Sequence, residues 1–391
     1  MNPSANGWIK VLLNKTHKYK NIWSLAPEVF YNKLRETGFI YGSNLSIIAD
    51  DFDTKDFSEE EKCKVNLWFA YYYFYNNFNR SNETFEASVI KFYSNEKPKS
   101  YRSFFGFSQH SNASGELEKL IEKRIHIDDN FITKNFKYFI VNALLFIDLL
   151  AYKQFLSGQT KTNTYIENFE SVVEKIVFMV LDLKPEKSEY DQSLMKLFEA
   201  SLSYHNQKEL SYTQALTHIT ETLEKQYILD VACMASWGDT KIDISESKFL
   251  EQLQIDLNLD KSILESAVNH INYFYVSYKN EIGFLNSKNL VQSFYDNSSK
   301  LVAKLIRRNG KRLQKELRDS KEVVGLLSQS TKRKLTDEEQ KKVQTQLLDI
   351  FKSIPSLAIF MLPGGMLLLP LVIKLIPTLL PSAFDDNRID N

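Results

Sequence analysis

The sequence is poor in the residues that bend or terminate regular structure. Its 391 residues include twelve glycines and nine prolines, and no proline occurs between residues 186 and 354. Glycine-bounded runs of alternating apolar and polar residues, which mark the strands of a sheet, are not found. Because glycine and proline most often end helices, we predict an all-α protein with long helices.

Cysteine is also scarce, and no leader sequence is predicted. The chain has two cysteines, Cys63 and Cys233, far apart and each in or beside an apolar stretch. A disulfide framework requires more cysteines at closer spacing, so we expect buried free thiols in a reducing compartment. The first residues lack a charged region followed by an apolar run, and no signal peptide is predicted. Basic and acidic residues balance at 49 each, so the net charge gives no general attraction to DNA.

Recognised catalytic and metal-binding motifs are absent. The six histidines are scattered, and we find no HExxH pair, phosphate-binding glycine loop, nucleophile elbow or kinase signature. Residues 50–61 are acidic, but an EF-hand beginning at Asp51 would need an oxygen ligand at Lys55 and glutamate at Lys62. We therefore predict a protein that is not an enzyme and has no cofactor. Ser58 and Glu61 fit a helix-capping box instead.

Several segments show the apolar spacing of packed helices. Residues 65–78 carry aromatic side chains on all sides, which is typical of a buried helix. Residues 114–156 predict two helices, and the uncharged run in the second, residues 138–147, is too short to cross a membrane. Apolar residues repeat at helical spacing over 166–180, before Pro185. Residues 1–224 are thus predicted to form an N-terminal helical region.

The next segment, residues 225–280, resembles the tellurite-resistance TerB-like helical module. The resemblance lies in an apolar helix ending in small residues, a short acidic turn, a capped helix and an L-x-L-D step, which here are residues 231–235, 238–239, 242–246 and 257–260. Acidic residues of that turn carry a metal in some relatives, so the resemblance implies a possible divalent-metal site at Asp239, Asp243 and Glu246. Asp243 and Glu246 equally fit a helix-capping box, Asp-x-x-Glu.

Positive charge concentrates after the TerB-like segment. Leucine and isoleucine at helical spacing over 300–321 predict an amphipathic helix whose polar side is basic. Such a helix is attracted to anionic lipid by about 1 kcal/mol per basic residue; RNA, for instance of a ribosome, is another candidate partner, and so is packing on the protein itself. Thr336 and Glu339 then predict a capping box. The candidate contact residues are Lys300, Lys304, Arg307, Arg308, Lys311, Arg312, Lys315 and Arg318.

The most apolar segment of the chain is residues 353–384. Residues 354–373 are twenty residues without a charge, enough to cross a hydrocarbon core of about 30 Å. Its prolines and paired glycines predict a kinked span or a re-entrant hairpin, and burial within the helical bundle is the third alternative. Positive charge before the segment and an acidic tail after it, residues 385–391, place the N-terminal part on the cytosolic side of the inner membrane. The candidate membrane residues are Ile354, Pro355, Pro363, Gly364, Gly365, Pro370, Lys374, Pro377 and Pro381.

From Glu316 onward the chain resembles the LETM family, the leucine-zipper, EF-hand-containing transmembrane proteins. The resemblance is carried by residues 318–321, 335–336 and 351–355, and by the proline register at residues 363, 370, 377 and 381. It implies an inner-membrane protein linked to exchange of potassium or calcium against protons, with a ribosome-binding region nearby. Met366 stands where the family has a glutamate within the span. An intramembrane carboxylate is the natural carrier of a proton or cation.

These observations lead to one hypothesis and two alternatives. We expect a membrane-anchored, LETM-related protein without enzyme activity that acts in cation homeostasis or membrane organisation. The layout of the whole chain resembles a group of bacterial LETM-related proteins linked to biofilm. The alternatives are a ribosome- or RNA-contacting module that uses the basic surface of residues 300–334, and a metal-sensing TerB-like adaptor. The predicted regions are 1–224, 225–280, 285–352, 353–384 and 385–391.

Overall fold

The computed structural model is built of helices. It describes residues 1–50, 54–95, 113–125, 131–159, 161–183, 210–236, 244–278, 302–303, 305–318, 320–330, 333, 335–354, 357 and 369–380. Within these residues every regular element is an α- or 3₁₀-helix and none is a strand, which confirms the predicted all-α class.

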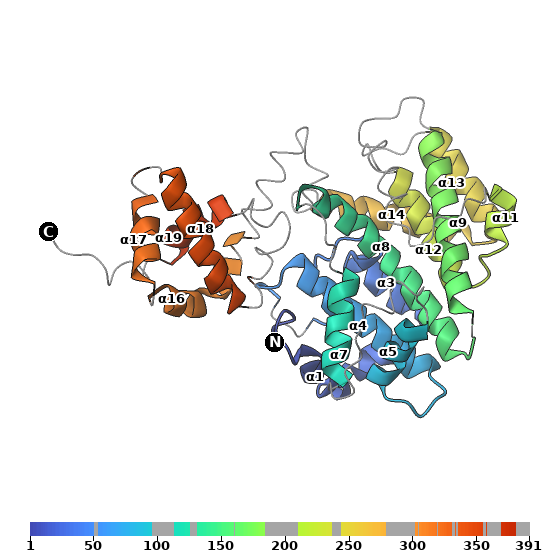
Figure 1. Ribbon diagram of the computed structural model, residues 1–391. Coiled ribbons are helices and arrows are strands. Elements are labelled where there is room, and N and C mark those ends of the chain that lie inside the picture. The colour runs from blue at the N-terminus through green and yellow to red at the C-terminus, as the bar shows by residue number, and fades with distance from the viewer. Residues whose placement is uncertain are drawn as a thin grey trace.

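The helices form two groups along the chain (Figure 1). We call the first the N-terminal body; it consists of α1 Trp8–Leu13, η1 Thr16–Tyr19, α2 Lys20–Trp23, α3 Pro27–Glu36, η2 Phe39–Tyr41, α4 Glu59–Phe78, α5 Phe85–Asn95, α7 Ala113–Ile125, α8 Phe131–Leu156, α9 Thr162–Asp182, α11 Tyr212–Leu216, α12 Thr222–Ser236, α13 Ile244–Asp256 and α14 Lys261–Tyr278. We call the second the C-terminal bundle, residues 302–380; it contains α16 Gly310–Arg318, α17 Lys321–Ser330, α18 Asp337–Lys352 and α19 Leu369–Leu379.

Helix α4 lies at the centre of the lower half of the N-terminal body in Figure 1, against α7 and α8. Its start is fixed by the predicted capping box: the Ser58 hydroxyl accepts from Glu61 N at 3.2 Å, and Ser58 N donates to the Glu61 carboxylate at 2.8 Å. Trp68 is fully buried, and its ring stacks on Tyr72 with centroids 5.2 Å apart. The aromatic run therefore serves the core, as predicted, because rings on all sides of one helix need packing partners on all sides.

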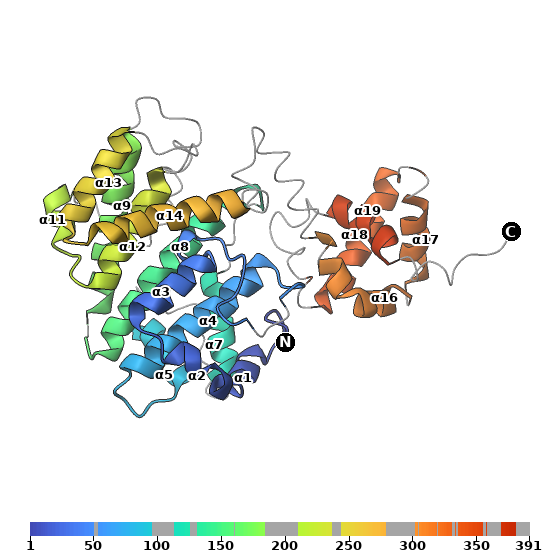
Figure 2. The same cartoon turned by 180° about the vertical axis from the view of Figure 1, so that it is seen from behind.

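One continuous hydrophobic core extends through the N-terminal body, from Trp8 to Tyr275. It includes the residues of α12, which packs against α9, α13 and α14 (Figure 2). Neither cysteine forms a disulfide, and both are completely buried in this core, as predicted. Helices α12, α13 and α14 occupy the segment that resembles a TerB-like module. That resemblance remains a prediction.

The C-terminal bundle has an apolar core of its own, from Val302 to Leu380. Helix α17 packs against α18 and α19, and α16 packs against α17. The predicted capping box starts α18: Thr336 Oγ1 accepts from Glu339 N at 3.3 Å, and Thr336 N donates to the Glu339 carboxylate at 2.8 Å. Short amphipathic helices of this kind are stabilised mainly by packing their apolar faces together.

Part of the predicted membrane segment belongs to this bundle core. Ile354, Val372 and Ile376 are buried in it, whereas Lys374 and Thr378 are exposed on the opposite side of α19. Helix α19 has eleven residues, and among the described residues no helix is both long enough and apolar enough to cross a membrane. Residues 355–356, 358–368 and 381–384 of the predicted segment lie outside the described residues.

Candidate functional site at the basic helix

The chain between Leu305 and Arg318 follows one helical path with a turn at Asn309. Asn309 N donates to Leu305 O at 3.1 Å, and Leu313 N donates to Asn309 O at 2.8 Å. Residues 305–308 and α16 therefore present a shared apolar side, on which Leu305, Leu313 and Leu317 are buried. The opposite side is directed to solvent, as the predicted amphipathic pattern requires.

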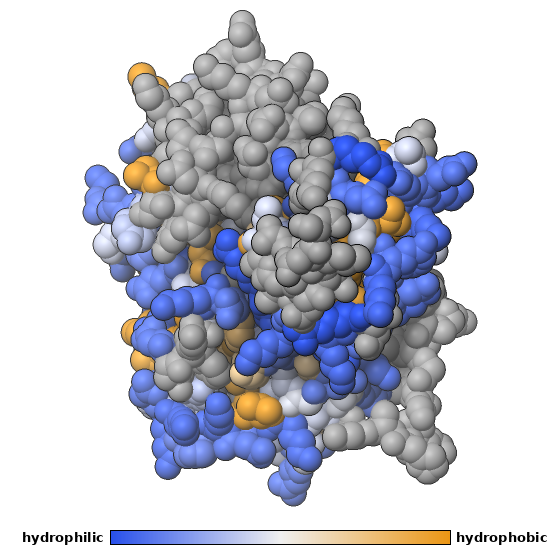
Figure 3. Space-filling model, turned by 90° about the vertical axis from the view of Figure 1, so that its left-hand side faces the viewer, coloured by the Kyte–Doolittle hydropathy of each residue, from blue (hydrophilic) through white to orange (hydrophobic). Residues whose placement is uncertain are grey.

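Five of the predicted contact residues lie on this solvent side, and we call them the basic face: Arg307, Lys311, Arg312, Lys315 and Arg318, all exposed. Lys300 and Lys304 lie outside the described residues. Figure 3 views the molecule from the side of the C-terminal bundle, and the described residues there are mostly hydrophilic, with small separate apolar areas. Clustered cations of this kind attract phosphate-bearing surfaces, whether lipid or nucleic acid.

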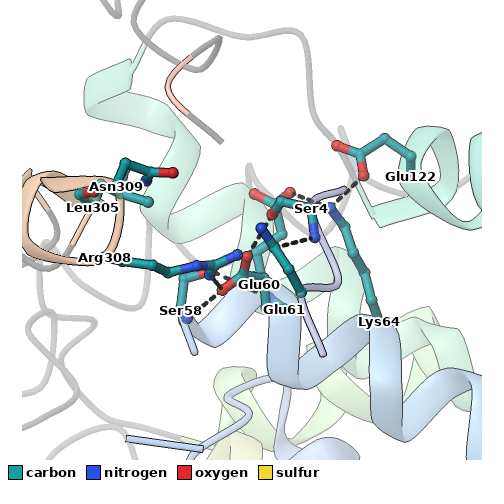
Figure 4. A network of polar contacts seen from close by, with 10 residues as sticks. Ser4, Ser58, Glu60, Glu61, Lys64, Glu122, Leu305, Arg308 and Asn309 are labelled. Atoms are coloured by element: carbon teal, nitrogen blue, oxygen red, sulfur yellow. Dashed lines mark hydrogen bonds and ion pairs between the residues drawn. The ribbon is translucent and has the colours of Figure 1, made fainter. Parts of the chain in front are cut away.

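Arg308 does not share this placement. Its side chain turns toward the N-terminal body and forms an ion pair with Glu61, at the start of α4 (Figure 4). Arg308 is 11% exposed and Glu61 only 1%. The Glu61 carboxylate also accepts from the Ser4 hydroxyl at 2.5 Å and from Ser58 N at 2.8 Å. One buried carboxylate thus joins the N-terminus, helix α4 and the basic helix.

A second buried ion network lies beside Glu61 on the same helix. Lys64, 1% exposed, pairs with Glu60 at 3.0 Å and with Glu122 of α7. Burial acts to lower the pKa of Lys64, but the two carboxylates outweigh it and the pKa is raised. The Glu60 charge is therefore compensated within the N-terminal body. Among the described residues, the cation that compensates the charge of Glu61 is Arg308 of the C-terminal bundle.

No local sequence pattern indicates the Arg308–Glu61 contact. The sequence predicts Glu61 as a capping residue and Arg308 as one cation of a basic helix. The two residues are 247 positions apart, and local patterns report neighbours within one or two helical turns. Asn309 next to Arg308, where the regular helix is interrupted, is the only local feature that distinguishes this position.

Of the three predicted metal residues, the structure describes one. Glu246 is buried in the first turn of α13, while Asp239 and Asp243 lie outside the described residues. Within the part of the chain that the structure describes, no three His, Cys, Asp or Glu side chains are grouped as metal ligands would be. The helix begins at Ile244, directly after Asp243, where the alternative capping prediction places its start.

The predicted membrane residues are likewise divided. Ile354 is buried and Lys374 exposed, and Pro370 and Pro377 lie within α19. Pro355, Pro363, Gly364, Gly365 and Pro381 lie outside the described residues.

Comparison with known proteins identifies the C-terminal part of the chain. Residues 335–391 match the family model described as LETM1-like, RBD. This match begins just before α18 and continues through α19, and it confirms the relationship to the LETM family that the proline register predicted. A search among curated proteins and a search among solved structures each found no match.

Proposed function

We propose that this LETM-related chain is a non-enzymatic protein of the cytoplasmic membrane that contacts anionic lipid through its basic face. The observation that carries the proposal is the placement of five exposed cations on one side of the basic helix, which precedes the LETM1-like residues 335–391 and is separated from them by α17. Each such cation contributes about 1 kcal/mol of attraction to an anionic surface. In this proposal the apolar segment 354–373 reaches the membrane between its two ends, Ile354 and Ile373, which are buried in the bundle core, and the bulk of the chain lies on the cytosolic side.

The proposed role is cation homeostasis or membrane organisation rather than ion transport by this chain alone. Met366 replaces the glutamate of the family, so residues 354–373 offer no carboxylate that could carry a proton or cation. The resemblance to bacterial LETM-related proteins linked to biofilm favours a role in organising the membrane surface.

Vesicle flotation of the full chain tests the lipid contact. We expect stronger binding to vesicles containing phosphatidylglycerol than to neutral vesicles, and less binding at high salt, because exposed charges are screened. The triple variant Arg307→Glu, Lys311→Glu and Arg312→Glu should lower partitioning to anionic vesicles by more than about a hundredfold. Equal binding to both vesicle types, or an unchanged triple variant, would refute the proposal.

A charge-matched control is available in the N-terminal body. Lys10, Lys18 and Lys20 are all exposed, and reversing the three to glutamate changes the net charge by the same amount. Binding of this control should remain close to that of the original chain. A carbonate wash after flotation then separates the two membrane contributions, since carbonate removes surface-bound protein and leaves an inserted apolar segment in place.

A second candidate function is contact with ribosomal RNA. It is favoured by the RBD description of the matched family model and by the ribosome-binding region that the LETM resemblance implies. Counterion release makes such a contact strongly salt-dependent. Co-sedimentation of the full chain with ribosomes, lost on reversal of Arg307, Lys311 and Arg312 but kept in the lysine control, would support it. Metal sensing at Asp239, Asp243 and Glu246 remains a prediction from the TerB-like resemblance.

A further inference from the structure

The two parts of the molecule have separate apolar cores. The core of the N-terminal body ends at Tyr275, and that of the C-terminal bundle begins at Val302. The main helix packings likewise lie within each part, such as α4 on α8 and α17 on α19. Among the described residues hydrophobic burial therefore stabilises each part internally, and a contact that orients one part on the other has to lie outside these two cores.

The Arg308–Glu61 ion pair is a contact of this kind between two described residues. It joins the basic helix to the start of α4 across 247 positions of sequence. Glu61 is oriented in advance, because the Ser4 hydroxyl and Ser58 N already hold its carboxylate. A charge fixed in place loses little freedom when its partner arrives, and a carboxylate at a helix N-terminus is itself favoured by the helix dipole.

Burial makes this pair selective for the cation it holds. In the docked arrangement Glu61 is 1% exposed, so replacing Arg308 by an uncharged or acidic residue there would leave a buried carboxylate without a compensating cation. Arg308 Nη2 is also buried and has no hydrogen-bond partner among the described residues, so the pair is made by one arm of the guanidinium. Lysine, with a single ammonium, can satisfy the same geometry, and an uncharged or acidic side chain cannot.

We propose that Arg308 and Glu61 form a polar latch that docks the C-terminal bundle on the N-terminal body. In the docked state Arg308 is withdrawn from the basic face, whereas its neighbour Arg307 stays exposed on it. The pair is also shielded from salt far better than the exposed cations. Docking thus fixes the direction in which the basic face points while leaving that face open.

Distance measurement between two spin labels tests the latch in the full chain. Labels at Glu36→Cys on α3 and Thr345→Cys on α18 use exposed positions in the two parts, and the native cysteines are fully buried. The unmodified latch should give one narrow distance peak that persists at high salt. Arg308→Glu should abolish this peak and give a broad distribution. A broad distribution in the starting protein, or a narrow peak in Arg308→Glu, would overturn the proposal.

Three further variants keep the result interpretable. Arg307→Glu makes the same charge change one residue away and should keep the narrow peak; equal broadening in this control would overturn the latch. Arg308→Lys should also keep it. Should Arg308→Glu lose helix content by circular dichroism, Glu61→Gln serves instead, because glutamine preserves the capping box and removes the charge; its peak should broaden. The measurement contains neither lipid nor RNA, so its failure is distinct from failure of the proposed function.

Discussion

The N-terminal body and the C-terminal bundle are stabilised by different means. Among the described residues, every fully buried polar or charged side chain lies in the N-terminal body, between Arg35 and Glu246. The core of the bundle is aliphatic apart from Phe351, and its ion pairs are open to solvent, as with Lys342 and Glu322, which are 52% and 55% exposed. A buried polar network requires unique partners, whereas an aliphatic core accepts several packings.

Because of this difference, the body is held in one specific packing, whereas the packing of the bundle is more adaptable. The body contains the Arg35–Asp230 pair and a second network in which Tyr93 and Arg124 both bond to the Asp148 carboxylate, at 2.9 and 2.6 Å. Such groups tolerate little rearrangement, because each would be left buried and unpaired. The bundle can shift its helices at lower cost. Under the proposed function, a bundle that contacts a membrane benefits from that freedom, and the body provides the fixed platform.

The largest expected effect of a single substitution is Arg35→Met in the body. Asp230 is completely buried and bonds to Arg35 Nε at 2.8 Å and to the Tyr31 hydroxyl at 2.5 Å. Burial raises the pKa of the Asp230 carboxyl and Arg35 opposes this shift, so losing the guanidinium should cost about 3–5 kcal/mol in the free energy of unfolding. Denaturant unfolding measures it.

Two companion variants decide whether charge is the cause. Glu36→Gln alters the exposed neighbour of Arg35 on the same helix and should change stability by less than about 0.5 kcal/mol. Adding Asp230→Asn to Arg35→Met removes the uncompensated charge and should recover part of the loss. Arg35→Met with unchanged stability would contradict the role given to this pair.

An intermediate effect is expected from Leu347→Ala in the bundle. Leu347 is completely buried in the aliphatic core, so truncation should cost about 2–5 kcal/mol. Because the two cores are separate, the loss should be local: amide hydrogen exchange should accelerate in α17 and α18 and stay unchanged in α4 and α12. Lys341→Ala, at an exposed position of the same helix, is the control. Equal loss of protection in both parts would show that they unfold as one unit.

Local patterns were sufficient to predict where α4 and α18 begin and that α4 is buried, whereas the short helices α1, α2 and α3 were not predicted individually. The capping boxes at Ser58–Glu61 and Thr336–Glu339 were both found from four-residue patterns, since cap and acceptor are three positions apart. The buried aromatic run of α4 was found because its rings leave no polar side. These features are encoded within one or two helical turns, and the tertiary packing is consistent with them.

Contacts between distant segments were beyond the reach of such patterns. Nothing near Glu61 or Arg308 marks them as partners, and the same holds for Arg35 and Asp230, which are 195 positions apart. The apolar segment shows a related difficulty, because hydropathy responds equally to burial in lipid and in protein. Lys374 and Thr378 lie four positions apart on α19, and both are exposed. Polar residues at this spacing indicate a helix whose opposite side packs against protein.

The smallest effect is expected at an exposed ion pair of the bundle. Hydrogen bonds from Arg333 and from the Thr336 backbone lower the pKa of Glu339 to about 2. A carboxyl pKa depressed in the folded state favours folding above its ordinary value and loses that contribution as the pH falls through the folded pKa. Arg333→Gln should raise the pKa of Glu339 in a carboxyl-carbon NMR titration yet barely change the unfolding midpoint, because solvent screens the pair. Arg312→Gln should leave the titration unaltered. An unchanged Glu339 pKa in Arg333→Gln would mean that the capping bond alone lowers it, and the exposed ion pairs of the bundle would then be dispensable even locally.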